Sequence, residues 1–322
     1  MKAALFRTYG VHESVVVGDT DTPEPKEHDI LIRVKATTVT AVDALFRSGN
    51  EFFPRMATGI FKPKIKILGT ELSGVVEKTG EKVTAFKKGD EVIADSGTRY
   101  GAHAEYVLVS DQDPVVHKPD YLPFKEAAAV TYGSLTALPF LRDHGKIKKG
   151  DRVLIIGASG SVGTYAVQLA KYYGAEVTGV TSSKNALLVK SLGADHIIDY
   201  RKTPLSDVSD QFDIIFDTVG KYSISSTRHL LRADGTYLTT VLSLRSVFDM
   251  LRTTRGNQKS ILAFTGMRKS EEKAEDLRMI ADLFKNHRLT AVIDRDFPLD
   301  DIHDAFDYVS QGHKAGNVVI TI

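Results

Sequence analysis

Residues 151–183 read DRVLIIGASGSVGTYAVQLAKYYGAEVTGVTSS and contain the strongest motif of the chain. An apolar run, RVLII, leads into three glycines, Gly157, Gly160 and Gly163, and an apolar helix pattern follows. In a dinucleotide-binding unit the first glycine permits a tight turn, and the second lets a pyrophosphate approach the backbone at a helix N-terminus. The third lets helix and strand pack closely. The flanking strand and helix favour this interpretation over a glycine-rich turn without a ligand.

The end of the next strand bears on the choice of cofactor. NAD sites typically place Asp or Glu there, to bond the ribose 2′-hydroxyl and repel a 2′-phosphate. Here Val180 is followed by Thr181, Ser182, Ser183 and Lys184, with no carboxylate. Hydroxyls and an ammonium group suit a phosphate, so we expect NADPH, with Tyr200 and Arg201 flanking its adenosine end. The alternative is that Lys184 is a solvated residue in the first turn of the next helix.

Strand and helix patterns alternate through this half of the chain, which predicts a parallel sheet covered by helices on both faces. A helical stretch from residue 125 precedes it, which we expect to break at Gly133 and restart through Thr136. The expected strands cover residues 152–156, 177–180, 196–198, 212–216 and 236–241, and the expected helices cover residues 161–173, 185–192 and 223–231.

The regions before and after this alternating segment have different secondary-structure patterns. Residues 1–115 are rich in strand patterns, at 29–39, 67–77, 90–94 and 104–109, and a short helix is expected at 41–47. Beyond the alternating region, amphipathic helices are expected at 271–286 and 300–310. Residues 291–297 and 317–322 read as strands without a place in the parallel sheet, so we expect the chain to return to the first domain.

Composition narrows the class of protein. A length of 322 residues fits two domains, and 42 Lys and Arg against 41 Asp and Glu provide no field to attract nucleic acid or a membrane. The chain has no cysteine, and its histidines are scattered, so we expect no metal site. No secretory leader and no apolar stretch of about 18 residues is visible. These features predict a cytoplasmic protein with no membrane or nucleic-acid partner.

Several motifs in register carry a family resemblance: AAAVTYGSLTAL, GDRVLIIGASGSVG, VTSSKN, SLGADHIIDY and FDTVG. Together they resemble the zinc-independent quinone oxidoreductase branch of the medium-chain dehydrogenase/reductase superfamily. The resemblance implies an α/β protein with a GroES-like, mostly-β catalytic domain and a doubly wound Rossmann domain, the cofactor lying in the cleft between them. The GroES-like domain would comprise residues 1–120, completed by about 288–322, and the Rossmann domain residues 121–287.

The resemblance also implies cofactor contacts by Thr136, by the loop containing Val219 and Gly220, and by Asn317. Together with the motif residues, the expected cofactor-binding set is Thr136, Gly157, Ser159, Gly160, Ser161, Val162, Gly163, Thr181, Ser182, Ser183, Lys184, Tyr200, Val219, Gly220 and Asn317.

The sequence departs from zinc-containing relatives at the metal ligands. Their first Cys falls at about Thr40, the His of their Gly-His-Glu motif falls at Thr70, and their third ligand falls near Val130 or Thr131. Hydroxyls are poor zinc ligands, so zinc-assisted alcohol oxidation is not expected. Without a Lewis acid, hydride transfer favours an electrophile already activated by conjugation, such as a quinone or an α,β-unsaturated carbonyl.

Candidate catalytic residues are Thr40, Asp43, Tyr100 and Tyr132, although each also has a structural explanation as a helix cap or core residue. One alternative function is an enoyl-thioester reductase, whose substrate would lie under residues 50–66. There Phe52, Phe53, Met56, Ile60 and Phe61 could form an apolar lid, and Lys62, Lys64 and Lys66 could face a phosphate.

Another alternative is an NADPH-binding redox sensor or interaction protein with little turnover. We further expect a homodimer, through an edge strand near residues 236–241 and the segment 260–266. The basic stretch at residues 245–255 reads as an exposed helix or a cap.

Overall fold

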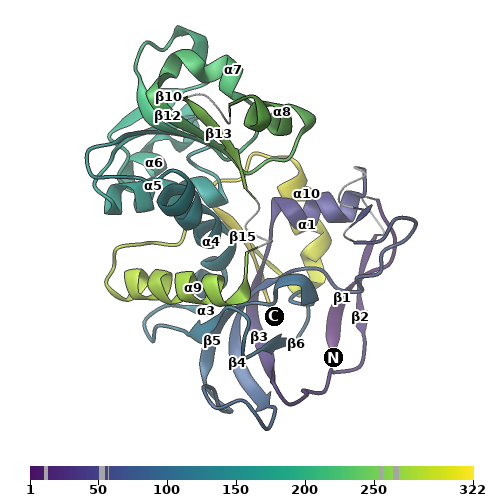
Figure 1. The fold of residues 1–322 in the computed structure, drawn as a ribbon. Helices are drawn as coiled ribbons and strands as arrows, with labels where there is room; N and C mark the ends of the chain where they lie inside the picture. Colours follow the sequence, from purple (N-terminus) through teal and green to yellow (C-terminus); the bar gives the residue numbers. More distant parts are fainter. Residues whose placement is uncertain (11–13, 51–54, 57, 254–256, 264–267) are drawn as a thin grey trace. The chain divides into compact units, whose positions relative to one another are not determined.

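The computed structural model describes residues 1–10, 14–50, 55–56, 58–253, 257–263 and 268–322 (Figure 1). The chain divides into two units. Unit 1 comprises Met1–Tyr132, Arg268–Lys285 and Ala291–Ile322, and unit 2 comprises Gly133–Met267 and Asn286–Thr290. The sequence pattern placed the first boundary near residue 120 and the return near residue 288. The structure instead assigns α9 (Ser270–Lys285) to unit 1, where it packs against β7 (Val115–His117).

Unit 1 is built on a mostly antiparallel sheet. Its order is β14-β15-β3-β4-β5-β7, and β6 pairs with β3. The strands are β3 (Asp29–Val39), β4 (Glu71–Thr79), β5 (Glu91–Asp95), β6 (Tyr106–Ser110), β7, β14 (Ile293–Pro298) and β15 (Asn317–Thr321). A separate hairpin joins β1 (Lys2–Phe6) to β2 (Val15–Asp19). Because β15 pairs antiparallel with β3, the C-terminal residues complete the sheet that the N-terminal residues begin.

Two apolar clusters fill unit 1. One contains Phe6, Leu68 and Phe306, and it packs α10 (Ile302–Ser310) beside α1 (Ala41–Ser48). The other contains Ile30, Leu72 and their neighbours along β3 and β4. Burying these side chains supplies the main stabilisation of the unit. A short helix, α3 (Phe124–Ala128), packs on the same sheet and leads toward unit 2.

Unit 2 contains a six-stranded, fully parallel sheet in the order β10-β9-β8-β11-β12-β13. The strands are β8 (Arg152–Ile156), β9 (Glu176–Thr181), β10 (His196–Asp199), β11 (Phe212–Asp217), β12 (Leu231–Thr239) and β13 (Lys259–Leu262). Helix α5 (Ser161–Tyr172) packs on β8 and β9, and α6 (Ala186–Ser191) packs on β9 and β10. The direction of winding reverses between β8 and β11, which is where doubly wound sheets bind ligands. The predicted fold class is confirmed.

Two local predictions were wrong. The helix does not break at Gly133, which lies inside α4 (Thr131–Pro139). A Cβ there would lie 2.6 Å from the Ser161 carbonyl oxygen, so this glycine permits close helix packing. The helix expected at 223–231 is present: α7 (Ile224–Thr227) continues into a 3-10 helix, Arg228–Leu230, and β12 begins at Leu231. Finally, β12 is interior to the sheet, so the edge strand is β13 and not residues 236–241.

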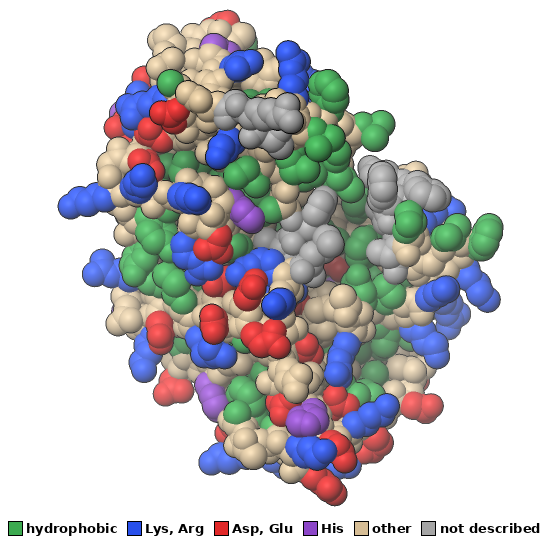
Figure 2. All heavy atoms as spheres, in the orientation of Figure 1, with side chains coloured by type: hydrophobic (Ala, Val, Ile, Leu, Met, Phe, Trp, Pro, Cys, Tyr) green, Lys and Arg blue, Asp and Glu red, His purple; other side chains and the backbone are tan. Residues whose placement is uncertain are grey.

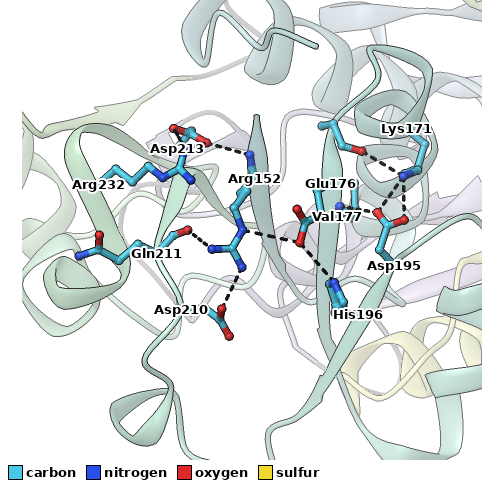
Figure 3. Close-up of polar contacts among 11 residues, drawn as sticks. Arg152, Lys171, Glu176, Val177, Asp195, His196, Asp210, Gln211, Asp213 and Arg232 are labelled. Atoms are coloured by element: carbon cyan, nitrogen blue, oxygen red, sulfur yellow. Dashed lines mark hydrogen bonds and ion pairs between the residues drawn. The ribbon is translucent and has the colours of Figure 1, made fainter. Parts of the chain in front are cut away.

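The amino ends of the parallel strands are joined by ion pairs (Figure 3). Arg152 at the start of β8 contacts Asp210 at 2.9 Å and Glu176 at 3.6 Å, and Glu176 also contacts His196 at 3.2 Å. Lys171 pairs with Asp195 at 2.7 Å. These ion pairs join four chain segments at the amino ends of the strands, whereas the glycine turn lies at their carboxyl ends.

Charged side chains of both signs occupy the visible face of the protein. On the face drawn in Figure 2, basic and acidic side chains are interspersed, in keeping with the formal net charge of +1. Within the described ranges, no helix has the length and apolarity needed to cross a bilayer.

Candidate functional site

The glycine turn of unit 2 follows β8 directly. Gly157 adopts φ +80°, a conformation that favours glycine, and its N–H donates to the Val180 carbonyl at 3.2 Å. A Cβ on Gly163 would overlap the Gly157 carbonyl oxygen, so close packing of the turn against α5 requires glycine there. Gly160 is different, because a Cβ there would meet only that oxygen, at 3.4 Å. The protein leaves open space over Gly160, where a ligand could approach the backbone.

The turn leads into the N-terminus of α5. Gly160 is the N-cap, and the N–H of Thr164 donates to its carbonyl at 2.9 Å. The first-turn amides of a helix, here those of Ser161, Val162 and Gly163, have no carbonyl within the helix to receive them. Such amides and the helix dipole together favour a phosphate group. The turn therefore has the geometry that a pyrophosphate site requires, and pyrophosphate binding there stays a prediction.

Ser159 connects this turn to the next strand. Its hydroxyl oxygen accepts hydrogen bonds from Thr181 Oγ1 at 2.9 Å and from Asn185 Nδ2 at 3.1 Å. With both acceptor positions used, the O–H of Ser159 remains as a donor toward a ligand. Asn185 was missed by sequence reasoning, because only the fold shows that this side chain turns back to the glycine motif.

The adenosine end predicted from TSSK contains more cations than the motif alone indicated. Lys184 is exposed and makes no ion pair with any described residue. Two cations lie near the Tyr200 ring: the Arg201 guanidinium is 5.8 Å from its centroid, and the Lys221 ammonium is 5.9 Å from it. Lys221 follows β11 in sequence, and it was not predicted because only the sheet brings it to Tyr200. Ser182 and Thr181 are buried behind this group.

A carboxylate also lies close to this group. Asp199, at the end of β10, is paired in register with Thr181 and accepts a hydrogen bond from the Ser183 hydroxyl. It also accepts from the Arg201 N–H at 3.0 Å. These bonds, the one from Ser183 foremost, hold the pKa of Asp199 below its usual range. Sequence reasoning found no acid at the end of β9, and the structure places one on the neighbouring strand instead.

The other predicted cofactor residues are divided between the units. Val219 and Gly220 form the loop after β11, and a Cβ on Gly157 would lie 2.5 Å from Val219 Cγ2, so the loop covers the glycine turn. Thr136 is buried in α4 and belongs to unit 2. Asn317 belongs to unit 1, where its side-chain amide donates to the Val292 carbonyl at 3.1 Å.

In unit 1, Thr40 and Asp43 form a capping box at the start of α1. Asp43 N–H donates to Thr40 Oγ1 at 3.2 Å, and Thr40 N–H donates to Asp43 Oδ2 at 2.9 Å. The Thr40 hydroxyl also donates to Asp43 Oδ2 at 2.6 Å, and Gly69 N–H donates to Asp43 Oδ1 at 3.2 Å. This explains both residues as structural elements, and a catalytic role for them stays a prediction.

The two candidate tyrosines, Tyr100 and Tyr132, are half-buried in unit 1. Burial raises the pKa of the Tyr100 phenol, and Asp43 and Asp95 raise it further. Burial likewise raises the pKa of Tyr132, with additional contributions from Glu71 and Asp43. Both phenols therefore stay protonated at neutral pH and can donate, but not remove, a proton.

Glu71 is a buried acid of unit 1 that follows Thr70, the position of the motif histidine in zinc-containing relatives. Its side chain is 2% exposed and accepts hydrogen bonds from the hydroxyls of Thr38 and Thr131, the latter at 3.2 Å. Burial raises the pKa of Glu71 to about 8, more than the Thr38 bond lowers it. Burial also lowers the pKa of Lys314 to about 8, against the opposing effect of Glu71.

The lid expected at residues 50–66 finds no support in the described side chains. Phe52 and Phe53 lie outside the described residues, and Phe61 is 95% exposed. Met56 and Ile60 are also exposed, as are Lys62, Lys64 and Lys66. The basic stretch from residue 245 lies in α8 (Leu244–Thr253), whose Leu244, Phe248 and Leu251 are exposed.

Comparisons with known proteins agree with this architecture. Residues 26–120 match the family described as alcohol dehydrogenase GroES-like domain, and residues 192–320 match the one described as zinc-binding dehydrogenase. The chain is 33% identical to the mouse protein named NAD(P)H oxidoreductase RTN4IP1, mitochondrial, over 92% of this chain and 82% of that one. It is 31% identical to tomato 2-methylene-furan-3-one reductase, over 99% of this chain and 79% of that one.

A solved structure is also similar over the whole length. The quinone oxidoreductase from Coxiella burnetii superimposes with a TM-score of 0.90 at 28% identity, covering 100% of this chain and 99% of that one.

The family matched by residues 192–320 is described as zinc-binding, but the positions of this chain that correspond to zinc ligands carry poor donors. Thr40 and Thr131 provide hydroxyls that are already bonded to Asp43 and Glu71. Cysteine is absent from the sequence, and the described residues contain no group of three or more His, Asp or Glu that could hold a metal. Zinc prefers thiolate, imidazole or carboxylate in a tetrahedral set, which these residues do not provide.

Proposed function

The chain belongs to the quinone oxidoreductase-like branch of the medium-chain dehydrogenase/reductase superfamily, and from this premise we propose that it is a zinc-independent, NADPH-dependent reductase of quinones or α,β-unsaturated carbonyls. Its class, an oxidoreductase with a nicotinamide cofactor, follows from its relatives. The finer proposal is supported above all by the glycine turn of unit 2, together with the cations at the expected adenosine end. It is also supported by the poor zinc donors at the corresponding positions of unit 1.

The preference for NADPH is supported by the groups around Tyr200. Lys184, Arg201 and Lys221 provide positive charge where a 2′-phosphate would lie, and Ser183 provides a hydroxyl. Asp199 opposes this preference, but its oxygens are already bonded to Ser183 and to the Arg201 N–H. A carboxylate has about four acceptor positions, so these bonds reduce the attraction of Asp199 for a ribose hydroxyl without removing it.

Two features of unit 1 support the proposed substrate class: the poor zinc donors and the two protonated tyrosines. A bound reduced nicotinamide supplies hydride, and a conjugated acceptor can delocalise the charge that arrives with it, without a metal. For an enone, hydride on the β-carbon must be matched by one proton at the α-carbon or oxygen, and for a quinone by one proton on oxygen. Tyr100 and Tyr132, which stay protonated, are the candidate hydrogen-bond donors to that oxygen.

The test is oxidation of NADPH and of NADH by the purified chain against 9,10-phenanthrenequinone and a linear 2-enal, with and without a chelator. We expect turnover with NADPH that the chelator leaves unchanged. Turnover that the chelator abolishes would refute zinc independence. Tight NADPH binding without turnover on either substrate would instead favour the redox-sensor alternative.

The cofactor preference has its own test in Lys184→Ala. We expect the KM for NADPH to rise about tenfold, the loss of one charge-assisted contact, while the KM for NADH stays unchanged. Lys190→Ala removes the same charge from the exposed end of α6 and serves as the matched control. An equal effect on both cofactors, or on both variants, would contradict the assignment.

We also propose that the chain forms a homodimer in the cytoplasm. In the described part of unit 2, β13 pairs only with β12, and a strand with a free edge favours addition of another strand. Sedimentation velocity of the native chain over a range of concentrations tests this proposal. A native chain that sediments as a monomer would refute it.

A further inference from the structure

The last residue of β11, Asp217, has a carboxylate that is 0% exposed and accepts four hydrogen bonds. Oδ1 accepts from the N–H groups of Val219 at 2.9 Å and Gly220 at 2.8 Å. Oδ2 accepts from the Tyr222 N–H at 3.0 Å and from the Tyr237 hydroxyl at 2.9 Å. One side chain thus receives three backbone donors of the loop that follows it and one donor from β12.

The same loop is fixed on its other sides. The Thr218 N–H and hydroxyl both donate to the Ile156 carbonyl, at 3.1 and 2.9 Å, which ties the loop to the end of β8. Val219 covers Gly157. Gly220 adopts φ +74°, and a Cβ there would lie 2.5 Å from Val241. The loop therefore lies directly over the glycine turn.

We propose that Asp217 is a positioning residue for cofactor binding, whose carboxylate, anchored by Tyr237, holds the Val219–Gly220 backbone over the glycine turn before the cofactor arrives. The inference rests on the proposed function, because it assigns the loop to the nicotinamide half of the bound dinucleotide. A loop ordered in advance loses less conformational entropy on binding, so its ligand is held more tightly.

Two observations indicate a function beyond stabilising the sheet. Val219 is 54% exposed and Gly220 is also exposed, so the backbone that Asp217 holds lies at the surface and not in the core. In addition, Tyr237 is itself buried and lies near both Asp217 and Asp249. Burial and these carboxylates raise the pKa of its phenol, so Tyr237 remains a donor throughout the physiological range.

The experiment compares three variants. Asp217→Asn keeps the size of the side chain but places an NH2 group against loop N–H donors or the Tyr237 hydroxyl. Tyr237→Phe removes only the anchor. Ser260→Ala, on β13, is the control, because it removes a buried hydroxyl that has no hydrogen-bond partner. Each protein is titrated calorimetrically with NADPH and with 2′,5′-ADP, the adenosine half alone, and amide exchange of residues 217–223 is followed without ligand.

We expect Asp217→Asn to weaken NADPH about tenfold or more, and Tyr237→Phe about threefold. Binding of 2′,5′-ADP should weaken by a clearly smaller factor in both, because, of this loop, only Lys221 lies at the expected adenosine end. Exchange of the loop amides should accelerate in the same order, and Ser260→Ala should match the native chain. Equal weakening of both ligands, unchanged loop exchange or unchanged NADPH affinity in Asp217→Asn would overturn the inference. A native chain that binds 2′,5′-ADP but not NADPH would also overturn it, and one that binds neither would refute the proposed function itself.

Discussion

Replacing Glu71 with glutamine is expected to remove a loss of stability that the native chain undergoes between pH 5 and pH 8. The folded carboxyl keeps its proton until about pH 8, whereas an unfolded glutamate releases it near 4.5. Between these values the unfolded chain binds fewer protons, so the free energy of unfolding falls as pH rises. The full difference between 8 and 4.5 corresponds to about 5 kcal/mol, at no more than about 1.4 kcal/mol per pH unit.

The chosen pH window isolates this group. Lys314 has its pKa lowered from 10.5 to about 8, so at pH 5 and 6 it is protonated in both folded and unfolded chains and adds no slope. Toward pH 8 it begins to lose its proton in the folded native chain and in the folded variant, so the comparison of the two proteins largely cancels its contribution. Glutamine is neutral at every pH and can still accept a hydrogen bond from Thr131, while its amide can donate to the Thr38 hydroxyl. The stability of Glu71→Gln relative to the native chain should therefore increase steadily with pH.

Urea unfolding followed by far-UV circular dichroism at pH 5, 6, 7 and 8 measures this, since the chain has no tryptophan to report by fluorescence. Glu77→Gln on the same strand is the control. Its ion pair with Lys88 holds the pKa of Glu77 below its usual range, so it is ionised in both states throughout the window. Parallel stability curves for Glu71→Gln and the native chain from pH 5 to 8 would refute the reasoning.

Two further predictions concern unit 2. Gly163→Ala should destabilise the fold by about 2 kcal/mol or more, because the new Cβ would overlap the Gly157 carbonyl oxygen. Gly160→Ala should melt within about 2 °C of the native chain but bind NADPH at least about tenfold more weakly. Calorimetric melting and titration of both variants check this, and equal loss of stability in the two would contradict it. Arg152→Met should cost about 1 kcal/mol in urea unfolding and leave NADPH affinity unchanged, because its ion pairs join the amino ends of the strands. A large loss of NADPH affinity in this variant would contradict the prediction, because it would show that the amino ends of the strands influence the site at their carboxyl ends.

The parts of the site that the sequence predicted are those whose geometry is local. Gly157, Gly160 and Gly163 lie within seven residues of one another, so strand, turn and helix fix their arrangement without the rest of the chain. The fold class followed from the same periodicity. Gly133 shows the limit of such reasoning, since a glycine in a helical pattern can mark either a break or a close contact, and only the Ser161 carbonyl across from it distinguishes the two.

The residues that were missed depend on neighbours distant in sequence. Asp199 lies beside Thr181 because β10 pairs with β9, and Lys221 reaches Tyr200 from the loop after β11. Glu71 appears in the sequence as one acid among 41. Its proton affinity follows from burial beneath β3 and the start of α4, through Thr38 and Thr131, which no local pattern reveals. Site residues could therefore be predicted where a single segment of the chain forms the site. They could not be predicted where the fold brings several segments together.

The pairing of β15 with β3 has a consequence for synthesis on the ribosome. The strands of unit 2 lie between residues 152 and 262, so its sheet can form while later residues are still being added. The sheet of unit 1 cannot, because residues 36–39 of β3 pair with residues 318–321. Until those residues emerge, that stretch of β3 presents unpaired N–H and C=O groups to any other strand nearby. The nascent chain should therefore depend most on chaperones, or aggregate most readily, after unit 2 has folded and before β15 is released.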